Sequence, residues 1–103
     1  MKTPSAISYD FQKAIQDAEE LERAANGMKR LVESDMEYSK YTLSTAWQGE
    51  AAEAYQKKYE RLQEKILQSA SSLIKQAQEI RSAAKRAYDA DMYAYRLANN
   101  RNY

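Results

Sequence analysis

Apolar residues recur at alternating spacings of four and three along the first half of the chain. Such spacings return to the same side of an α-helix, so a long run of them predicts a helix with one narrow apolar seam. All eight positions of the run are apolar: Ile7, Phe11, Ala14, Ala18, Leu21, Ala25, Met28 and Val32. A chain built on this seam is helical over most of its first half.

The seam changes phase after Val32. The same alternation would next place Asp35 and Ser39 in the apolar line, whereas a slip of one residue places Met36 and Leu43 there instead. Because apolar side chains favour the buried side of an amphipathic helix, the slipped register is the one we expect. The first helix is therefore predicted to run from about residue 6 to residue 43.

A second seam begins at Ala52 and follows the same alternation. Its fourteen positions are Ala52, Tyr55, Tyr59, Leu62, Ile66, Ser69, Leu73, Gln76, Ile80, Ala83, Ala87, Ala90, Ala94 and Leu97. Twelve of them are apolar or tyrosine. The two exceptions, Ser69 and Gln76, are each followed by an alanine, at Ala70 and Ala77. This pattern predicts a second helix from about residue 50 to residue 98, with a frayed tail over 99–103.

Turn-forming residues are scarce, which excludes a fold rich in β-hairpins. The chain has one proline, Pro4, and two glycines, Gly27 and Gly49. Strong helix formers such as alanine, glutamate and lysine dominate the rest, so the fold class is predicted to be all-α. The Asn26-Gly27 pair is a turn signal inside the first helix, but the seam stays in phase across it, and we expect the helix to continue. Ser5 or Ser8 is expected to cap the helix start.

The segment Trp47-Gln48-Gly49 lies between the two seams and contains the only tryptophan. A short connection between two long helices predicts an antiparallel hairpin, with the turn at about 44–49. Gly49 would allow the chain to reverse, and the Trp47 indole would cover the ends of both seams. Glu50 and Glu53 would then lie in the first turn of the second helix, where carboxylates complement the helix dipole.

A two-helix hairpin leaves apolar side chains beside its seam in contact with water. We therefore expect a dimer that forms a four-helix bundle, with the whole chain 1–103 as one domain. Residues 1–46 carry six basic and eight acidic side chains, and residues 47–103 carry ten and seven. Antiparallel packing sets the acidic half against the basic half, which favours that pairing.

Composition argues against most catalytic and metal-binding functions. The chain has no cysteine and no histidine, so disulfides, thiolate metal sites and histidine chemistry are excluded. Its many carboxylates have the spacing of solvated helix faces, and a hairpin offers no evident cleft to hold two of them for catalysis. We expect no enzyme, no cofactor and no metal site.

Charge gives little reason to expect nucleic acid or membrane as a partner. The net charge is +1, and the segment "MKTPSAISYDFQK" does not resemble a secretory signal. Basic residues and tyrosines alternate near the end of the second helix, but Asp89 and Asp91 interrupt them. That segment is interpreted as a face for protein docking rather than for an anionic membrane.

A chain of this length, with two amphipathic helices and Trp47-Gln48-Gly49 between them, resembles the WXG family of small ESAT-like proteins of bacterial type VII secretion. The following "EAAEAY", which ends in an aromatic at Tyr55, is also usual in that family. The resemblance implies a hairpin that pairs as a homodimer, or as a heterodimer with a WXG-type paralogue or with the helical domain of an effector. It also implies export in the folded state by the type VII membrane ATPase, without a cleaved signal peptide. Members act as secreted factors or as targeting partners of larger effectors.

One departure from the family concerns its export signal. In the family an aromatic is followed four residues later by an acid near the end of the second helix, and no tyrosine or phenylalanine here has that spacing. The nearest match is Tyr88 with Asp91, three residues apart and still on one helical side. The pair is either a variant signal or a core tyrosine beside a solvated charge, in which case a partner would carry the signal.

A second hypothesis, a helical adaptor that is not secreted, explains the seams and the tyrosines equally well. A dimeric helical module that stays in the cytoplasm and holds other proteins together needs the same amphipathic pattern. Only the Trp47-Gln48-Gly49 turn and the Tyr88/Asp91 pair separate this adaptor from a secreted protein.

Overall fold

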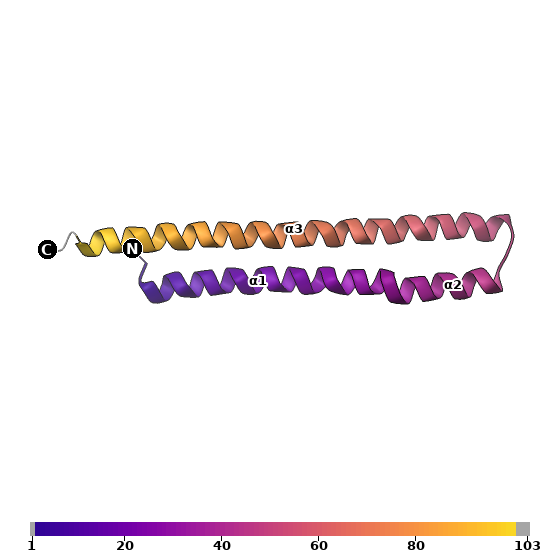
Figure 1. Cartoon of the computed structure of the whole chain (residues 1–103), viewed down its shortest axis with the longest axis horizontal. Helices are drawn as coiled ribbons and strands as arrows, with labels where there is room; N and C mark the ends of the chain where they lie inside the picture. The colour runs from indigo at the N-terminus through magenta and orange to yellow at the C-terminus, as the bar shows by residue number, and fades with distance from the viewer. Residues whose placement is uncertain (1, 101–103) are drawn as a thin grey trace. The chain divides into compact units, whose positions relative to one another are not determined.

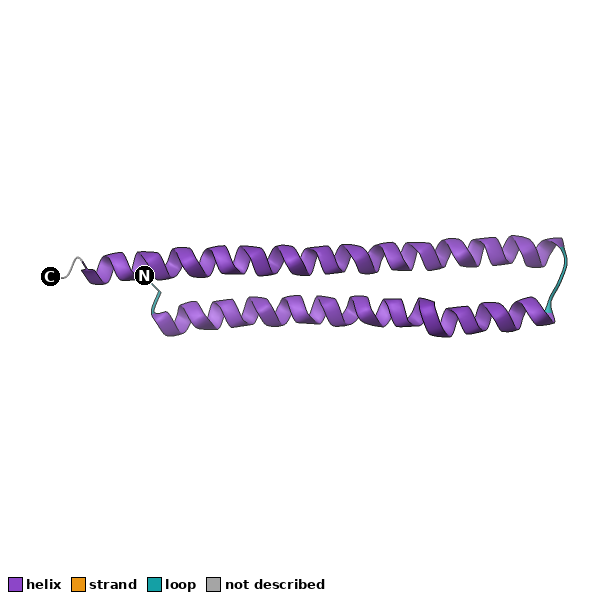
Figure 2. Cartoon of the chain, in the orientation of Figure 1, coloured by secondary structure: helices purple, strands orange, loops and turns teal. Residues whose placement is uncertain are grey.

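A computed structural model describes residues 2–100 of the chain, which are helical from Pro4 to Ala46 and from Glu50 to Asn100 (Figures 1 and 2). The elements in order are α1 (Pro4–Arg30), a π-helical turn η1 (Leu31–Met36), α2 (Glu37–Ala46) and α3 (Glu50–Asn100). The all-α fold is confirmed, and so is the antiparallel hairpin, because α3 returns alongside the first three elements after one short loop.

The ends of the helices differ in detail from the sequence prediction. The Thr3 hydroxyl accepts a hydrogen bond from the Ala6 N–H at 3.2 Å, so Thr3 caps α1 in place of the expected Ser5 or Ser8. Pro4 follows as the first helical residue, a position where its missing N–H costs nothing. At the other end α3 continues through Asn100, so residues 99 and 100 of the expected frayed tail are helical, and 101–103 lie outside the described residues.

The chain divides into two compact units, each a pair of antiparallel helical segments. The terminal unit comprises residues 1–22 and 75–103, of which 2–22 and 75–100 are described. The turn unit comprises residues 23–74 and contains the interhelix turn. Asn26-Gly27 lies within α1 in the turn unit, so the helix continues through this pair as expected.

Alanine dominates the buried seam in both units. Ala18 and Ala77 in the terminal unit, and Ala25 and Ala70 in the turn unit, have no exposed surface. Ala18 and Ala25 are seven residues apart in α1, and Ala70 and Ala77 are seven residues apart in α3. Seven residues make about two helical turns, so each pair lies along one line of its helix. Small side chains in such a line let two helix backbones approach closely. The remaining fully apolar core consists of Ile7, Val32, Met36 and Ala52.

The buried line of α3 lies one residue further along the chain than the apolar stripe seen in the sequence. Gln63, Ala70 and Ala77 are buried, whereas their predecessors Leu62, Ser69 and Gln76 are exposed. Of the predicted seam, Tyr59, Ile66, Leu73 and Ile80 are half-buried, and Tyr55 and Leu62 are 46% and 49% exposed. Large side chains do not fit between closely packed backbones, so they flank the alanine line instead of occupying it.

The seam predicted for α1 is the side of that helix that the structure buries. Ile7, Ala18, Ala25 and Val32 are buried, and the other members are half-buried, namely Phe11, Ala14, Leu21 and Met28. The phase slip after Val32 coincides with η1, whose buried residues are Val32 and Met36. A π-helical turn absorbs one extra residue within a helix, so it returns the apolar side to α3 after the irregular spacing.

An ion pair spans the two helices of the terminal unit. The Arg81 guanidinium donates two hydrogen bonds to the Glu22 carboxylate, at 2.7 and 2.5 Å, and both side chains are about two-thirds buried. These bonds to the charged carboxylate lower the pKa of Glu22 below its ordinary value. The fork-shaped contact defines a register between α1 and α3 that a periodic alanine line cannot define alone.

Deleting Ser34 tests whether η1 accommodates one surplus residue. With that residue removed, the segment is expected to become ordinary α-helix with Met36 still facing α3, so the free energy of unfolding should change by less than about 1 kcal/mol. Deleting the exposed Ala24 of regular α1 turns one side of the helix by roughly 100° and should cost at least about 3 kcal/mol. Urea unfolding followed by circular dichroism at fixed protein concentration measures both. Equal losses for the two deletions would contradict this role of η1.

Candidate functional site: the interhelix turn

The turn reverses the chain within three residues, Trp47, Gln48 and Gly49. Trp47 has extended backbone, with φ −138° and ψ 122°, and its N–H donates to the Leu43 carbonyl at 2.9 Å. Gly49 has φ 117°, a left-handed value that side chains other than glycine rarely adopt. Its carbonyl accepts the Glu53 N–H at 3.0 Å, which starts the hydrogen bonding of α3. The turn predicted at about 44–49 is shorter than expected, because 44–46 belong to α2 and the chain reverses over 47–49 through Gly49.

An aromatic ladder runs from the turn onto α3. The Trp47 indole lies against the Tyr55 ring with centroids 5.8 Å apart, and Tyr55 stacks on Tyr59 at 6.3 Å. Tyr55 and Tyr59 are four residues apart, so they lie on one side of the helix. Trp47 remains 41% exposed, so its indole packs on α3 from the outside and does not close the seam as a buried plug.

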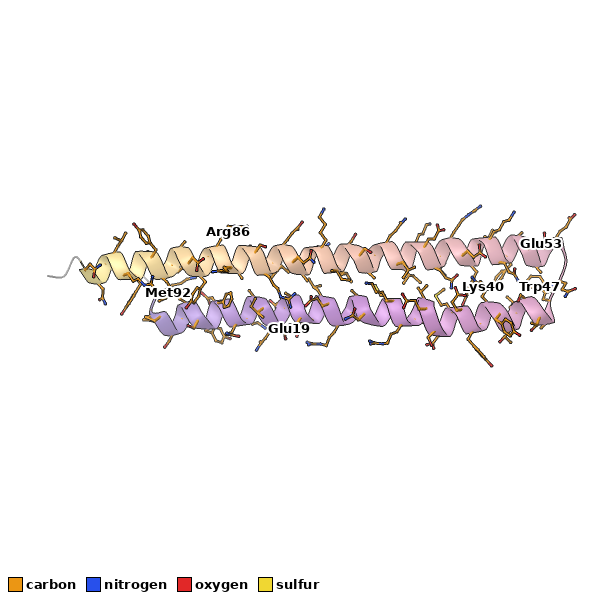
Figure 3. All side chains as sticks on the ribbon, in the orientation of Figure 1. Glu19, Lys40, Trp47, Glu53, Arg86 and Met92 are labelled. Carbon is orange, nitrogen blue, oxygen red and sulfur yellow. The ribbon has the colours of Figure 1, made fainter. Side chains whose placement is uncertain are left out.

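A shallow concavity lies beside the ladder. Its volume is about 350 Å³, and it is lined by Ser44, Trp47, Gln48, Gly49, Ala52, Glu53 and Gln56. Figure 3 shows Trp47 at the turn and Glu53 in the first turn of α3. Glu50 and Glu53 both occupy that first turn, where their charges complement the helix dipole. The turn thus presents aromatic surface and backbone polar groups together, a combination suited to binding a protein chain.

The flank of the turn unit carries further apolar surface. Leu62 is half-exposed on α3, with Tyr59 and Ile66 on one side and Lys58 and Lys65 on the other, by their spacings of three and four. Other large side chains exposed in this unit are Leu31, Tyr38, Tyr41, Trp47 and Tyr55. Exposed apolar side chains at this density are typical of an interface.

The Tyr88/Asp91 pair lies in the terminal unit and is engaged by α1 and the residues before it. The Tyr88 ring packs on Phe11 with centroids 5.2 Å apart. Lys2 Nζ lies 3.5 Å from the Asp91 carboxylate and 2.7 Å from that of Asp10. Its hydrogen bond and charge interaction with Asp10, followed by the charge of Asp91, raise the pKa of Lys2. These five residues line a small cavity of about 120 Å³ together with Ile7 and nearby alanines.

Sequence reasoning missed a buried polar group in the turn unit. Gln63 is the one buried polar side chain among the described residues, with 5% exposure. Its amide donates to Glu37 at 3.1 Å and accepts from Lys40 at 3.5 Å. The seven-residue spacing of Gln63 with Ala70 and Ala77 was the available signal, and the neighbouring line of larger apolar residues obscured it. No sequence signal pointed to Lys2, whose position depends on the fold.

The described residues contain no arrangement suited to metal binding or membrane crossing. Between residues 2 and 100, no three acidic, histidine or cysteine side chains gather closely enough to hold a metal ion. No helix in the same range has the length and apolar character needed to span a bilayer. The exposed apolar features of these residues include the turn, the aromatic ladder and the flank around Leu62.

Comparison with protein-family models, curated proteins and solved structures finds no match to this chain. The resemblance to the WXG family therefore depends on the quoted residues and on their places in the hairpin.

The two glycines offer a matched test of the turn geometry. Alanine at Gly49 would meet no atom within 4 Å, so Gly49→Ala is strained only by its backbone and should destabilise by about 1–2 kcal/mol. Gly27→Ala, inside regular helix, should stabilise by about 0.5–1 kcal/mol, since its added carbon comes no closer than 3.9 Å to Arg30. Chemical unfolding of both variants measures the signs. Stabilisation by Gly49→Ala would show that the turn does not need a left-handed residue.

Proposed function

We propose that this chain is a helical secretion protein, exported in the folded state as a dimer by a bacterial type VII system. It would act as a secreted factor or as the targeting partner of a larger effector. The observation that carries the proposal is the placement of Trp47-Gln48-Gly49 as the turn of an antiparallel hairpin, with the indole accessible on the outside. An accessible aromatic turn is a surface that an export apparatus can recognise.

We expect the dimer to form through the apolar side chains on the flank of the turn unit. Leu62 with its half-buried neighbours Tyr59 and Ile66 forms an apolar strip that Lys58 and Lys65 border. In the terminal unit, Asp10 and Asp17 take the corresponding place beside the half-buried Ala14 and Leu21 of α1, and each also pairs with a lysine of its own chain, Lys2 and Lys13. A second copy lying antiparallel sets the terminal unit of one chain against the turn unit of the other, so lysines meet aspartates. Charge complementarity then selects this orientation, and apolar burial supplies the affinity.

A non-secreted helical adaptor is the alternative, and one observation favours it. Phe11 covers part of Tyr88 and Lys2 pairs with Asp91, so both members of the variant signal make contacts within their own chain. The pair is then a structural feature of the terminal unit, and this chain lacks a signal of its own. Either the protein stays in the cytoplasm, or a partner that carries the signal takes it through the export machinery.

Export is tested by measuring the protein in culture medium from its native host, with the type VII ATPase intact and deleted. The proposal expects release only with the ATPase intact, while a cytoplasmic marker stays in the cells. Trp47→Ala should reduce release by at least about tenfold, because a central aromatic contact is lost. Tyr9→Ala, which removes an aromatic exposed on α1 in the terminal unit, should be exported normally. Retention of wild-type protein in both strains would support the adaptor.

The dimer is tested separately by analytical ultracentrifugation. Wild-type protein should sediment as a dimer, and Leu62→Glu should raise the dissociation constant at least about thirtyfold by placing a charge in the apolar strip. Gln68→Glu adds the same charge to an exposed position of α3 outside the strip and should remain dimeric. A monomeric wild type, or a Leu62→Glu variant that associates normally, would overturn this interface.

A further inference from the structure

We propose that residues 37–46, which form α2, are an opening segment that detaches from α3 while η1 and the terminal unit stay closed. Detachment would uncover the first turns of α3 beside the aromatic ladder. The inference concerns the hairpin itself and holds whether or not the protein is exported.

The helix of the opening segment is intrinsically weak. The sequence of α2 is EYSKYTLSTA, in which six of ten residues are tyrosine, serine or threonine. These residues form helix less readily than alanine, lysine or glutamate. None of the ten is buried, so tertiary packing compensates little for the low propensity. By contrast, α1 and α3 each contain fully buried alanines.

Hydroxyl groups compete for the backbone of α2. The Ser44 hydroxyl donates to the Tyr41 carbonyl, and the Thr45 hydroxyl donates to the Thr42 carbonyl, each at 2.8 Å. Such side-chain bonds to carbonyls one turn back weaken and bend a helix. Both lie in the last turn before Trp47, where the helix already ends. This part of α2 therefore has the weakest hold on helical geometry.

Both borders of the opening segment interrupt regular α-helix. On one side η1 replaces the normal hydrogen bonds with wider π-helical ones over Leu31–Met36. On the other side the three turn residues separate α2 from α3. The segment can consequently detach without a break in the regular hydrogen bonding of α1 or α3. Local opening usually follows such boundaries.

Polar contacts hold α2 against α3. Lys40 reaches Gln63 at 3.5 Å and Glu37 at 3.2 Å, and Gln63 donates to the same Glu37 oxygen at 3.1 Å. Figure 3 shows Lys40 on the side of α2 that faces α3. Water can replace each of these bonds once α2 lifts, so their loss costs little free energy. The nearest buried apolar residues, Val32 and Met36, belong to η1 and stay packed when α2 lifts.

Opening changes which side chains of α3 are exposed near the turn. In the closed form Ala52 and Gln63 of α3 are buried, and Tyr59 is half-buried. Lifting α2 exposes all three next to Trp47 and Tyr55 and lengthens the accessible aromatic strip along α3. The opening segment thus acts as a lid that controls how much of this strip a binding protein can reach.

Native-state hydrogen exchange of the full chain, read residue by residue at low denaturant, tests the lid. Amides of 37–46 should exchange at least about tenfold faster than those of 14–22 in the terminal unit, because their opening does not require global unfolding. Ser44→Ala with Thr45→Ala removes both hydroxyl bonds and raises helix propensity. It should slow exchange across 37–46 about fivefold and leave the terminal unit unchanged.

The matched control is Ser71→Ala with Ser72→Ala, two exposed positions on α3 of the turn unit. It adds similar helix propensity outside the lid and should leave exchange of 37–46 unaltered. Equal protection of 37–46 and 14–22 in the wild type would overturn the proposal. So would a uniform slowing of all amides in the Ser44/Thr45 variant, since that result means α2 opens only when the whole hairpin unfolds.

Discussion

The close approach of the helices along a line of alanines is the constraint on which the other features depend. Ala18, Ala25, Ala70 and Ala77 have no exposed surface, and no bulky side chain shares their lines at those levels. Close backbones leave room for small side chains between them and force large ones to the flanks. The half-exposed Tyr55 and Leu62 are the result. A seam that packs the hairpin tightly therefore also creates its outward apolar strip.

A periodic alanine line leaves the register of the hairpin open, and polar contacts define it. In the terminal unit, Arg81 holds Glu22 through two hydrogen bonds. In the turn unit, the buried Gln63 joins Glu37 and Lys40. Such contacts match at one alignment only, because a shift by one heptad would separate every partner. Their contribution to register is greater than their contribution to stability.

The two units differ in the chemistry of their side chains. The turn unit exposes Trp47 and several tyrosines and has a weak helix in α2, features that suit contact with other proteins. In the terminal unit Phe11 packs on Tyr88, and Lys2 bridges Asp10 and Asp91. The turn unit therefore carries the exposed aromatic side chains around Trp47, while Tyr88 and Asp91 make contacts within their own chain.

The sequence by itself determined the helical class, the place of the turn and the phase slip after Val32, because these depend on local periodicity and on rare residues such as Gly49. The sequence prediction of Ser5 or Ser8 as the cap was wrong, because Thr3 precedes Pro4 at the helix start and accepts the Ala6 N–H. Tertiary structure alone decided which line of α3 is buried. Leu62 and Gln63 lie on adjacent lines, and hydrophobicity favours the leucine, but the space between close backbones admits the line that contains Ala70 and Ala77. The size of side chain that fits between α1 and α3 depends on both helices. It decided which line of α3 is buried, although the apolar pattern of α3 alone favoured the other line.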